Sequence, residues 1–189
     1  MPTNRRFCRF SRSSEGNESG LRWEESDGFC ISSFVILTDA AEPYRVLVGK
    51  VNPTGPWEHL GGLNPERARL HAGGWMLPAS QLLLREGPDE AAHRILLEML
   101  GGIDPTLEAP RVVSEVYAPK RNPEARSHWD LSFLYRGRWV GPVPQLPEVW
   151  RELRFVDVRE SPRTAFARSH DEVLDSVGLG PIRGSEGRG

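Results

Sequence analysis

Three charged side chains are spaced so that they lie on one edge of a predicted helix over residues 88–100. At about 100° per residue, Glu90, Arg94 and Glu98 fall within about 80° of one another. The same side chains suit i,i+4 salt bridges on an exposed helix, each worth about 0.2–0.5 kcal/mol. The helix alone therefore indicates either a reaction centre or a charged surface.

The remaining positions of this predicted helix are mostly apolar. They form a broad arc that suits a buried face, made by Ala91, Ala92, Ile95, Leu96, Met99 and Leu100. Pro88 in the first turn and Gly101 after the last turn predict where the helix begins and ends. Ile95 and Met99 directly follow the charged residues of the edge, and neither carries an oxygen that could bind a cation.

The segment over residues 73–102, GGWMLPASQLLLREGPDEAAHRILLEMLGG, resembles the signature segment of the Nudix hydrolases. The positions that match the signature are Gly74, Trp75, Pro78, Glu86, Ala91, Arg94, Glu98 and Gly101. The resemblance implies that Arg94 orients the catalytic glutamates and that Glu86 and Glu98 bind Mg²⁺ or Mn²⁺ on a diphosphate. It also implies a catalytic role for Glu98.

The signature is degenerate in this chain. Ala79-Ser80 stands where the family has Gly-Gly, and Arg85 stands where it has Gly. Ile95 and Met99 stand where the family has metal-binding glutamates. Because Mg²⁺ takes oxygen ligands, we expect a depleted site in which the remaining glutamates hold at most one ion.

A loop over residues 119–130 is the predicted source of compensating side chains. Some Nudix enzymes with a depleted signature, such as the GDP-mannose mannosyl hydrolases, are similar to this chain and use residues outside the signature. His128 could act as a base near neutral pH, and Asp130 could be a metal ligand. The basic side chains that could bind phosphate are Lys120, Arg121 and Arg126. The alternative is an ordinary solvated loop.

A second long loop is predicted over residues 52–74, which show no clean periodicity. Long loops in compact domains are often functional. Trp57 could stack on a base or sugar of a ligand, and the other candidates in the loop are His59, Arg67, Arg69 and His71. His93, on the predicted helix, is expected at the surface or at the rim of a site.

The apolar patterns predict strands over residues 29–38, 44–51, 75–84, 111–118, 129–139 and 153–158. The first two read as a hairpin, and Pro78 breaks the third. A final helix is predicted over 169–177, where Ser169 and Glu172 have capping-box spacing. This element order indicates an α+β protein with a mixed β-sheet. The resemblance implies a Nudix-like α/β/α sandwich.

Three regions are expected along the chain. Residues 1–22 and 179–189 are polar and glycine-rich and predict flexible N- and C-terminal tails. Residues 23–178 predict the Nudix-like domain.

The composition of the chain limits the kinds of molecule that it is expected to bind. A net charge of −2 gives no overall attraction to nucleic acid, and no apolar run is long enough for a membrane span. Two cysteines are too few for a disulfide framework, which fits a cytoplasmic protein. The resemblance implies a nucleotide-like small-molecule ligand and a homodimer, since Nudix relatives are often dimers.

Two functions follow from these expectations. The first is a Nudix-type hydrolase that cleaves a nucleoside diphosphate linked to another moiety by metal-assisted attack of water. The second is a catalytically inactive Nudix-fold module that binds a nucleotide or a protein partner. Ile95 and Met99 favour the second, because apolar side chains at these positions stabilise a core rather than bind a metal.

Overall fold

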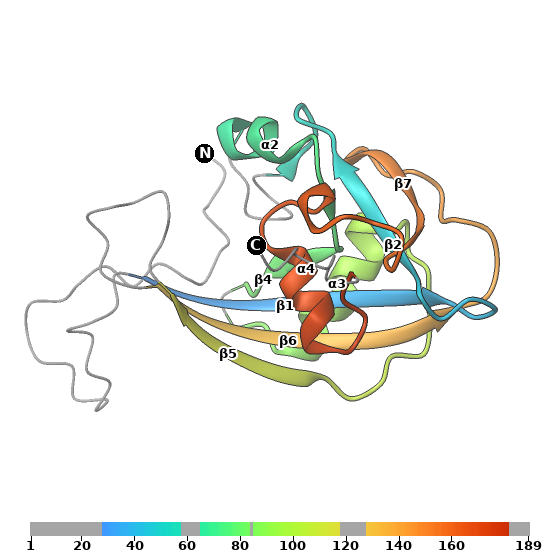
Figure 1. Cartoon of the computed structure of the whole chain (residues 1–189). Helices are drawn as coiled ribbons and strands as arrows, with labels where there is room; N and C mark the ends of the chain where they lie inside the picture. The colour runs from blue at the N-terminus through green and yellow to red at the C-terminus, as the bar shows by residue number, and fades with distance from the viewer. Residues whose placement is uncertain (1–27, 58–64, 84, 118–127, 182–189) are drawn as a thin grey trace, which may run out of the picture.

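The computed structural model of the chain describes residues 28–57, 65–83, 85–117 and 128–181 (Figure 1). A seven-stranded sheet forms its centre, with the strand order β3-β2-β1-β6-β5; β4 also pairs with β1, and β7 with β2. The strands are β1 (Gly28–Asp39), β2 (Arg45–Val51), β3 (Trp75–Met76), β4 (Ala79–Gln81), β5 (Arg111–Tyr117), β6 (His128–Trp139) and β7 (Trp150–Asp157).

The sheet is mixed, as expected. β1 runs parallel to β6 along its whole length, from Gly28 opposite His128 to Asp39 opposite Trp139. All the other strand pairs are antiparallel, including the predicted β1–β2 hairpin. Pro78 separates β3 from β4, and the two short strands pair with different partners, β2 and β1.

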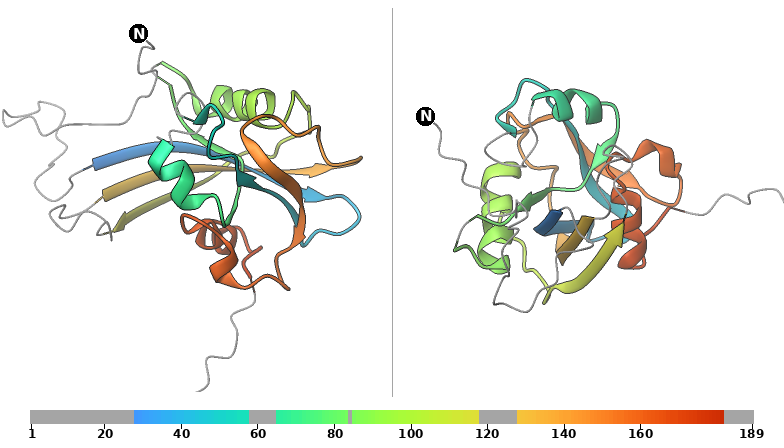
Figure 2. Two further views of the ribbon diagram at one scale, coloured as in Figure 1. Left: turned by 90° about the horizontal axis from the view of Figure 1, so that it is seen from above. Right: turned by 90° about the vertical axis from the view of Figure 1, so that its left-hand side faces the viewer.

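Helices cover both faces of the sheet. The helices are α2 (Pro65–His71), α3 (Pro88–Met99), α4 (His170–Ser176) and a short 3₁₀ helix, η1 (Arg163–Ala165). Figure 2 shows α3 and α4 on opposite sides of the central strands. β1 supplies both faces, because Val35 and Leu37 pack in the cluster with α3 whereas Ile36 packs in the cluster with α4. The expected α/β/α layering is therefore confirmed.

The start and end of α3 follow from local sequence. The Gly87 amide donates to a Glu90 carboxylate oxygen at 2.7 Å, which satisfies a free N–H at the helix start. Gly101 follows the last turn with φ +72, a left-handed conformation that glycine adopts without strain. The helix therefore lies where the sequence predicts it.

Three details of the structure differ from the sequence-based expectation. Residues 52–74 are not one loop, because α2 forms within them, with Pro65 at its first position. β7 begins at Trp150 instead of residue 153. Ser169 does not cap α4 with its side chain, because its φ of 57 is left-handed and no side-chain cap bond forms.

Two further observations concern the chain as a whole. Leu179, which the sequence analysis assigns to the C-terminal tail, is buried in the cluster with α4. In the ranges described above, no helix has the length and apolar character needed to cross a membrane.

Candidate functional site

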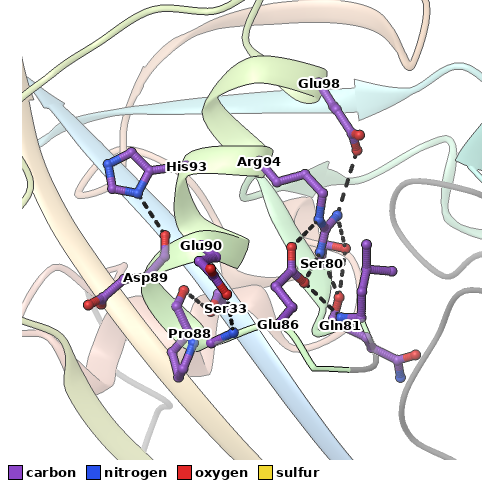
Figure 3. A network of polar contacts seen from close by, with 12 residues as sticks. Ser33, Ser80, Gln81, Glu86, Pro88, Asp89, Glu90, His93, Arg94 and Glu98 are labelled. Carbon is purple, nitrogen blue, oxygen red and sulfur yellow. Dashed lines mark hydrogen bonds and ion pairs between the residues drawn. The ribbon is translucent and has the colours of Figure 1, made fainter.

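The Arg94 guanidinium is the centre of a polar network between α3 and the segment that leads into it (Figure 3). Its Nε and Nη2 donate to the two carboxylate oxygens of Glu86, at 2.6 and 2.8 Å. Nη1 donates to Ser80 Oγ at 3.1 Å, and Nη2 donates to the Gln81 carbonyl oxygen at 3.0 Å. Glu98 Oε2 lies 3.6 Å from Nη1, at the outer side of the guanidinium. The arginine therefore binds β4, the turn after it and α3 together.

Both carboxylate oxygens of Glu86 accept hydrogen bonds in this network. Besides the two bonds from Arg94, Oε2 accepts the Leu83 backbone N–H at 2.7 Å. The side chains of Glu86 and Arg94 are each only 11% exposed. Burial opposes the charge on Arg94, but the carboxylates of Glu86 and Glu98 outweigh it and raise the pKa of the guanidinium above its ordinary value. The single positive charge of Arg94 thus already balances one of the two carboxylates that were expected to bind a metal, and Glu86 is the one that it holds on both oxygens.

Ile95 and Met99, at the other two expected ligand positions, are core residues. Both are 0% exposed and belong to the cluster that α3 forms with the sheet. The backbone of this turn is also engaged, since the Met99 carbonyl oxygen accepts Trp150 Nε1–H at 2.7 Å. These two side chains therefore stabilise the fold and present no face to a ligand.

Two tryptophans fill the same cluster. Trp57 and Trp150 pack edge to face, with ring centroids 4.9 Å apart. Trp57 is 2% exposed and donates its ring N–H to the Val149 carbonyl oxygen at 2.7 Å. The predicted stacking of Trp57 on a base or sugar is therefore wrong, because its ring is already buried. Trp150 lies so close to the β2 backbone that a Cβ on Gly49 would come within 2.3 Å of the indole.

The donor set does not fit the Mg²⁺ or Mn²⁺ that the resemblance implies. Glu86 and Glu98 do not converge on an open point, because the Arg94 guanidinium lies between them. Among the residues placed by the structure, no group of three His, Cys, Asp or Glu side chains could hold a metal ion. Asp130 lies in β6, opposite Glu115 of β5 and Cys30 of β1, and forms no such group with the helix glutamates.

Several predicted site residues stay predictions. His128 begins β6, where its backbone is opposite Tyr117. The phosphate-binding candidates Lys120, Arg121 and Arg126, and His59 of the other loop, lie outside the described residues.

The remaining candidates lie on helices. Arg67 and Arg69 are exposed on α2, whereas His71 of the same helix is buried. His93 lies on α3, as expected, with its Nδ1 2.8 Å from the Asp89 carbonyl oxygen.

A cavity of about 330 Å³ adjoins α3 next to His93 and was not expected from sequence. It is lined by Asp89, Ala92, His93, Leu107, Glu108, Ala109, Pro110 and Tyr135. The Tyr135 hydroxyl donates to Asp89 Oδ1 at 2.5 Å, and burial together with this carboxylate raises the pKa of the phenol. The lining carries two carboxylates and no lysine or arginine, so it does not suit a diphosphate. In the sequence, Asp89 has only the features of a residue at a helix start. Its position beside the cavity could therefore not be predicted.

At the level of sequence, no family profile and no curated protein matches this chain. Solved structures do resemble it. The MutT protein from Methanosarcina mazei Go1 has a TM-score of 0.55 at 14% identity, over 79% of this chain and 93% of its own.

Two further solved structures are also similar to this chain. The NUDIX domain of Shewanella oneidensis NrtR, crystallised with ADP ribose, has a TM-score of 0.55 at 14% identity, over 85% of this chain and 93% of its own. A MutT NUDIX hydrolase from Burkholderia pseudomallei has a TM-score of 0.50 at 16% identity, over 79% and 98%.

Proposed function

We propose that this chain, which has the Nudix fold, is a binding module that recognises a nucleotide-like ligand without metal-dependent hydrolysis. The observation that carries the proposal is the state of α3. Ile95 and Met99 are fully buried, and Glu86 is held by Arg94 on both carboxylate oxygens. Metal-assisted phosphoryl chemistry needs oxygen ligands that fix an ion against the substrate. In this chain, the α3 positions that would supply these oxygen ligands are occupied by apolar side chains of the core.

The ligand class rests on the fold and on one neighbour. The NUDIX domain of Shewanella oneidensis NrtR was crystallised with ADP ribose, so this fold can hold such a molecule. We therefore assign to this chain a ligand built from a nucleoside diphosphate. The acidic cavity beside His93 does not suit its phosphates. The basic side chains Lys120, Arg121 and Arg126 supply the charge that a diphosphate needs. A cytoplasmic location stays a prediction from the low cysteine content.

A panel of ligands separates binding from turnover. ADP-ribose, nucleoside diphosphate sugars and dinucleotides are incubated with the protein, with and without Mg²⁺ or Mn²⁺. Binding is followed by calorimetry and by the shift of the unfolding temperature, and hydrolysis by chromatography of the products. We expect at least one panel member to bind, with no product formed in either metal. Metal-dependent turnover would contradict the proposal, and so would a complete absence of binding.

Hydrolysis of a nucleoside diphosphate linkage is the second candidate, and Glu98 favours it. Its side chain is 27% exposed, and it lies 3.6 Å from Arg94, beyond the length of a good hydrogen bond. This carboxylate could orient or deprotonate a water, and His128 is the alternative base. The Glu98→Gln variant is the test, because it keeps the shape of the side chain and removes its basicity. Turnover by the unmodified chain that this variant loses would support the hydrolase.

A further inference from the structure

β5 forms an outer edge of the sheet. One side of the strand pairs with β6 from Arg111 opposite Leu134 to Tyr117 opposite His128. In the described part of the chain, no strand pairs with its other side, and Figure 1 shows β5 lying outside β6. A strand in this position directs alternate N–H and C=O groups outward, which is a template for pairing with another strand.

We propose that this edge binds the β5 edge of a second copy of the chain, antiparallel, with Val113 on the two-fold axis. Two copies of one strand related by such an axis place odd positions opposite odd positions, because the axis keeps each face of the sheet on its own side. The axis must therefore pass through a residue. Each choice of that residue gives one register, and the charges on β5 discriminate between the registers.

Only one central register pairs opposite charges. With Val113 on the axis, Arg111 lies opposite the partner's Glu115, and symmetry repeats the pair at the other end. With Val112 on the axis, Arg111 lies opposite a valine. With Ser114 on the axis, Glu115 lies opposite a valine. The Val113 register thus gives an apolar centre flanked by two ion pairs.

The exposure of the strand agrees with this arrangement. Arg111 and Glu115 are exposed, and neither has an ion pair within the described ranges. Val112 is 53% exposed, and in this register it lies opposite Ser114 of the partner. Val113 is half-buried against the cluster with α4, so its backbone is held in place before the partner arrives.

The length of the strand limits the affinity. Pro110 precedes β5 and has no N–H to donate, so the shared ladder ends there. An interface limited to one short strand per copy is smaller than the standard stable interface of about 1,600 Å². We therefore expect a weak dimer whose population rises with protein concentration.

Sedimentation velocity over a wide range of concentration tests the proposal with charge reversals. The unmodified chain should form dimers. Arg111→Glu and Glu115→Arg each turn two attractive pairs into two repulsive ones, which should weaken the dimer about tenfold or more. The double variant Arg111→Glu with Glu115→Arg restores both pairs with the signs exchanged and should recover the dimer. Arg138→Glu, an exposed arginine of β6 outside the β5 ladder, is the matched control and should change nothing.

Other outcomes would overturn the proposal. A chain that is monomeric at every concentration removes it. Dimers that both single reversals leave unchanged place the interface elsewhere, and a double variant that stays monomeric while keeping the melting temperature of the unmodified chain rules out the Val113 register. Pairing of this edge only with a different protein would also contradict it. Ligand binding and hydrolysis do not enter this test, so it stands or falls independently of the proposed function.

Discussion

Arg94 shows how one side chain can replace a bound cation. Its five N–H donors suit the two carboxylate oxygens of Glu86, the Ser80 hydroxyl and the Gln81 carbonyl group at once. A metal would have to displace a charge that cannot be neutralised by deprotonation. The network therefore stabilises the junction of β4 with α3, and it is a candidate for a large effect on stability.

Arg94→Met should lower the free energy of unfolding by about 3 kcal/mol, because it leaves a nearly buried carboxylate without its partner. The double variant Arg94→Met with Glu86→Gln should be less destabilised than the single one. In that double variant the carboxylate left without Arg94 is that of the partly exposed Glu98, while the glutamine can still accept the Leu83 N–H. Urea unfolding of the four proteins of this cycle measures the coupling. Additive effects would contradict the network.

His170 should make stability depend on pH. It is buried, its Nδ1 accepts the Leu77 N–H at 2.7 Å, and its ring packs edge to face on Phe34. Burial, and then the nearby charges of Arg168 and His71, lower the pKa of the imidazole well below its ordinary value.

The sign of the effect follows from linkage. The unfolded chain binds the proton near pH 6.5, while the folded chain does not, so the stability is complete above about pH 6.5 and falls as the pH drops below it. The slope is up to about 1.4 kcal/mol per pH unit. In urea unfolding between neutral and mildly acidic pH, His170→Gln should show a smaller slope. Equal slopes in the two proteins would contradict this role of His170.

At the scale of the element, α3 begins and ends where the sequence predicts, and its packing face includes the two positions at which the Nudix signature has glutamates. This can be tested by putting the carboxylates back. Ile95→Glu and Met99→Glu should each destabilise the chain by several kcal/mol, because each buries a charge among apolar side chains. Thermal unfolding with and without Mg²⁺ or Mn²⁺ gives the result.

The matched control lies on the same helix. Leu97 is 67% exposed, so Leu97→Glu should leave the unfolding temperature nearly unchanged. A folded Ile95→Glu, Met99→Glu double variant that the metal ions stabilise would contradict the conclusion that packing alone fills these positions.

Elements in which apolar residues recur at a regular spacing could be predicted from sequence, and short or irregular elements could not. The apolar arc of α3 and the continuous apolar run of β1 both lie where the pattern predicts, because burial decides these positions along the whole element. α2 was missed because it is short and buries only Ala68 and His71, which is too little to produce a period.

Single positions whose role depends on tertiary contacts could not be predicted either. Nothing in the local sequence of Trp57 reveals that Trp150 packs on it, and the left-handed backbone of Ser169 overrides its capping-box spacing. The departures at Ile95 and Met99 were visible in the sequence. Pairing of Arg94 with Glu98 follows from their helical spacing, whereas the capture of both Glu86 oxygens by the guanidinium depends on how the turn before α3 folds back on the helix.

At the scale of the whole molecule, β1 holds the layers together. It pairs with β6 along its entire length and also with β2 and β4, and residues 35–37 are fully buried. The amides of these residues should exchange with solvent last, near the rate set by global unfolding. The exposed turn over residues 40–44 should exchange much faster. Hydrogen-exchange mass spectrometry measures both, and similar rates in the two segments would contradict a central role for β1.

The packing around Met99 also has an evolutionary consequence. Any mutational path from this chain to a metal-binding helix must place carboxylates in the apolar cluster that Ile95 and Met99 share with Trp57 and Trp150. Every single step on that path removes stability before any metal affinity can compensate for it. Selection for a stable fold would therefore disfavour these intermediates.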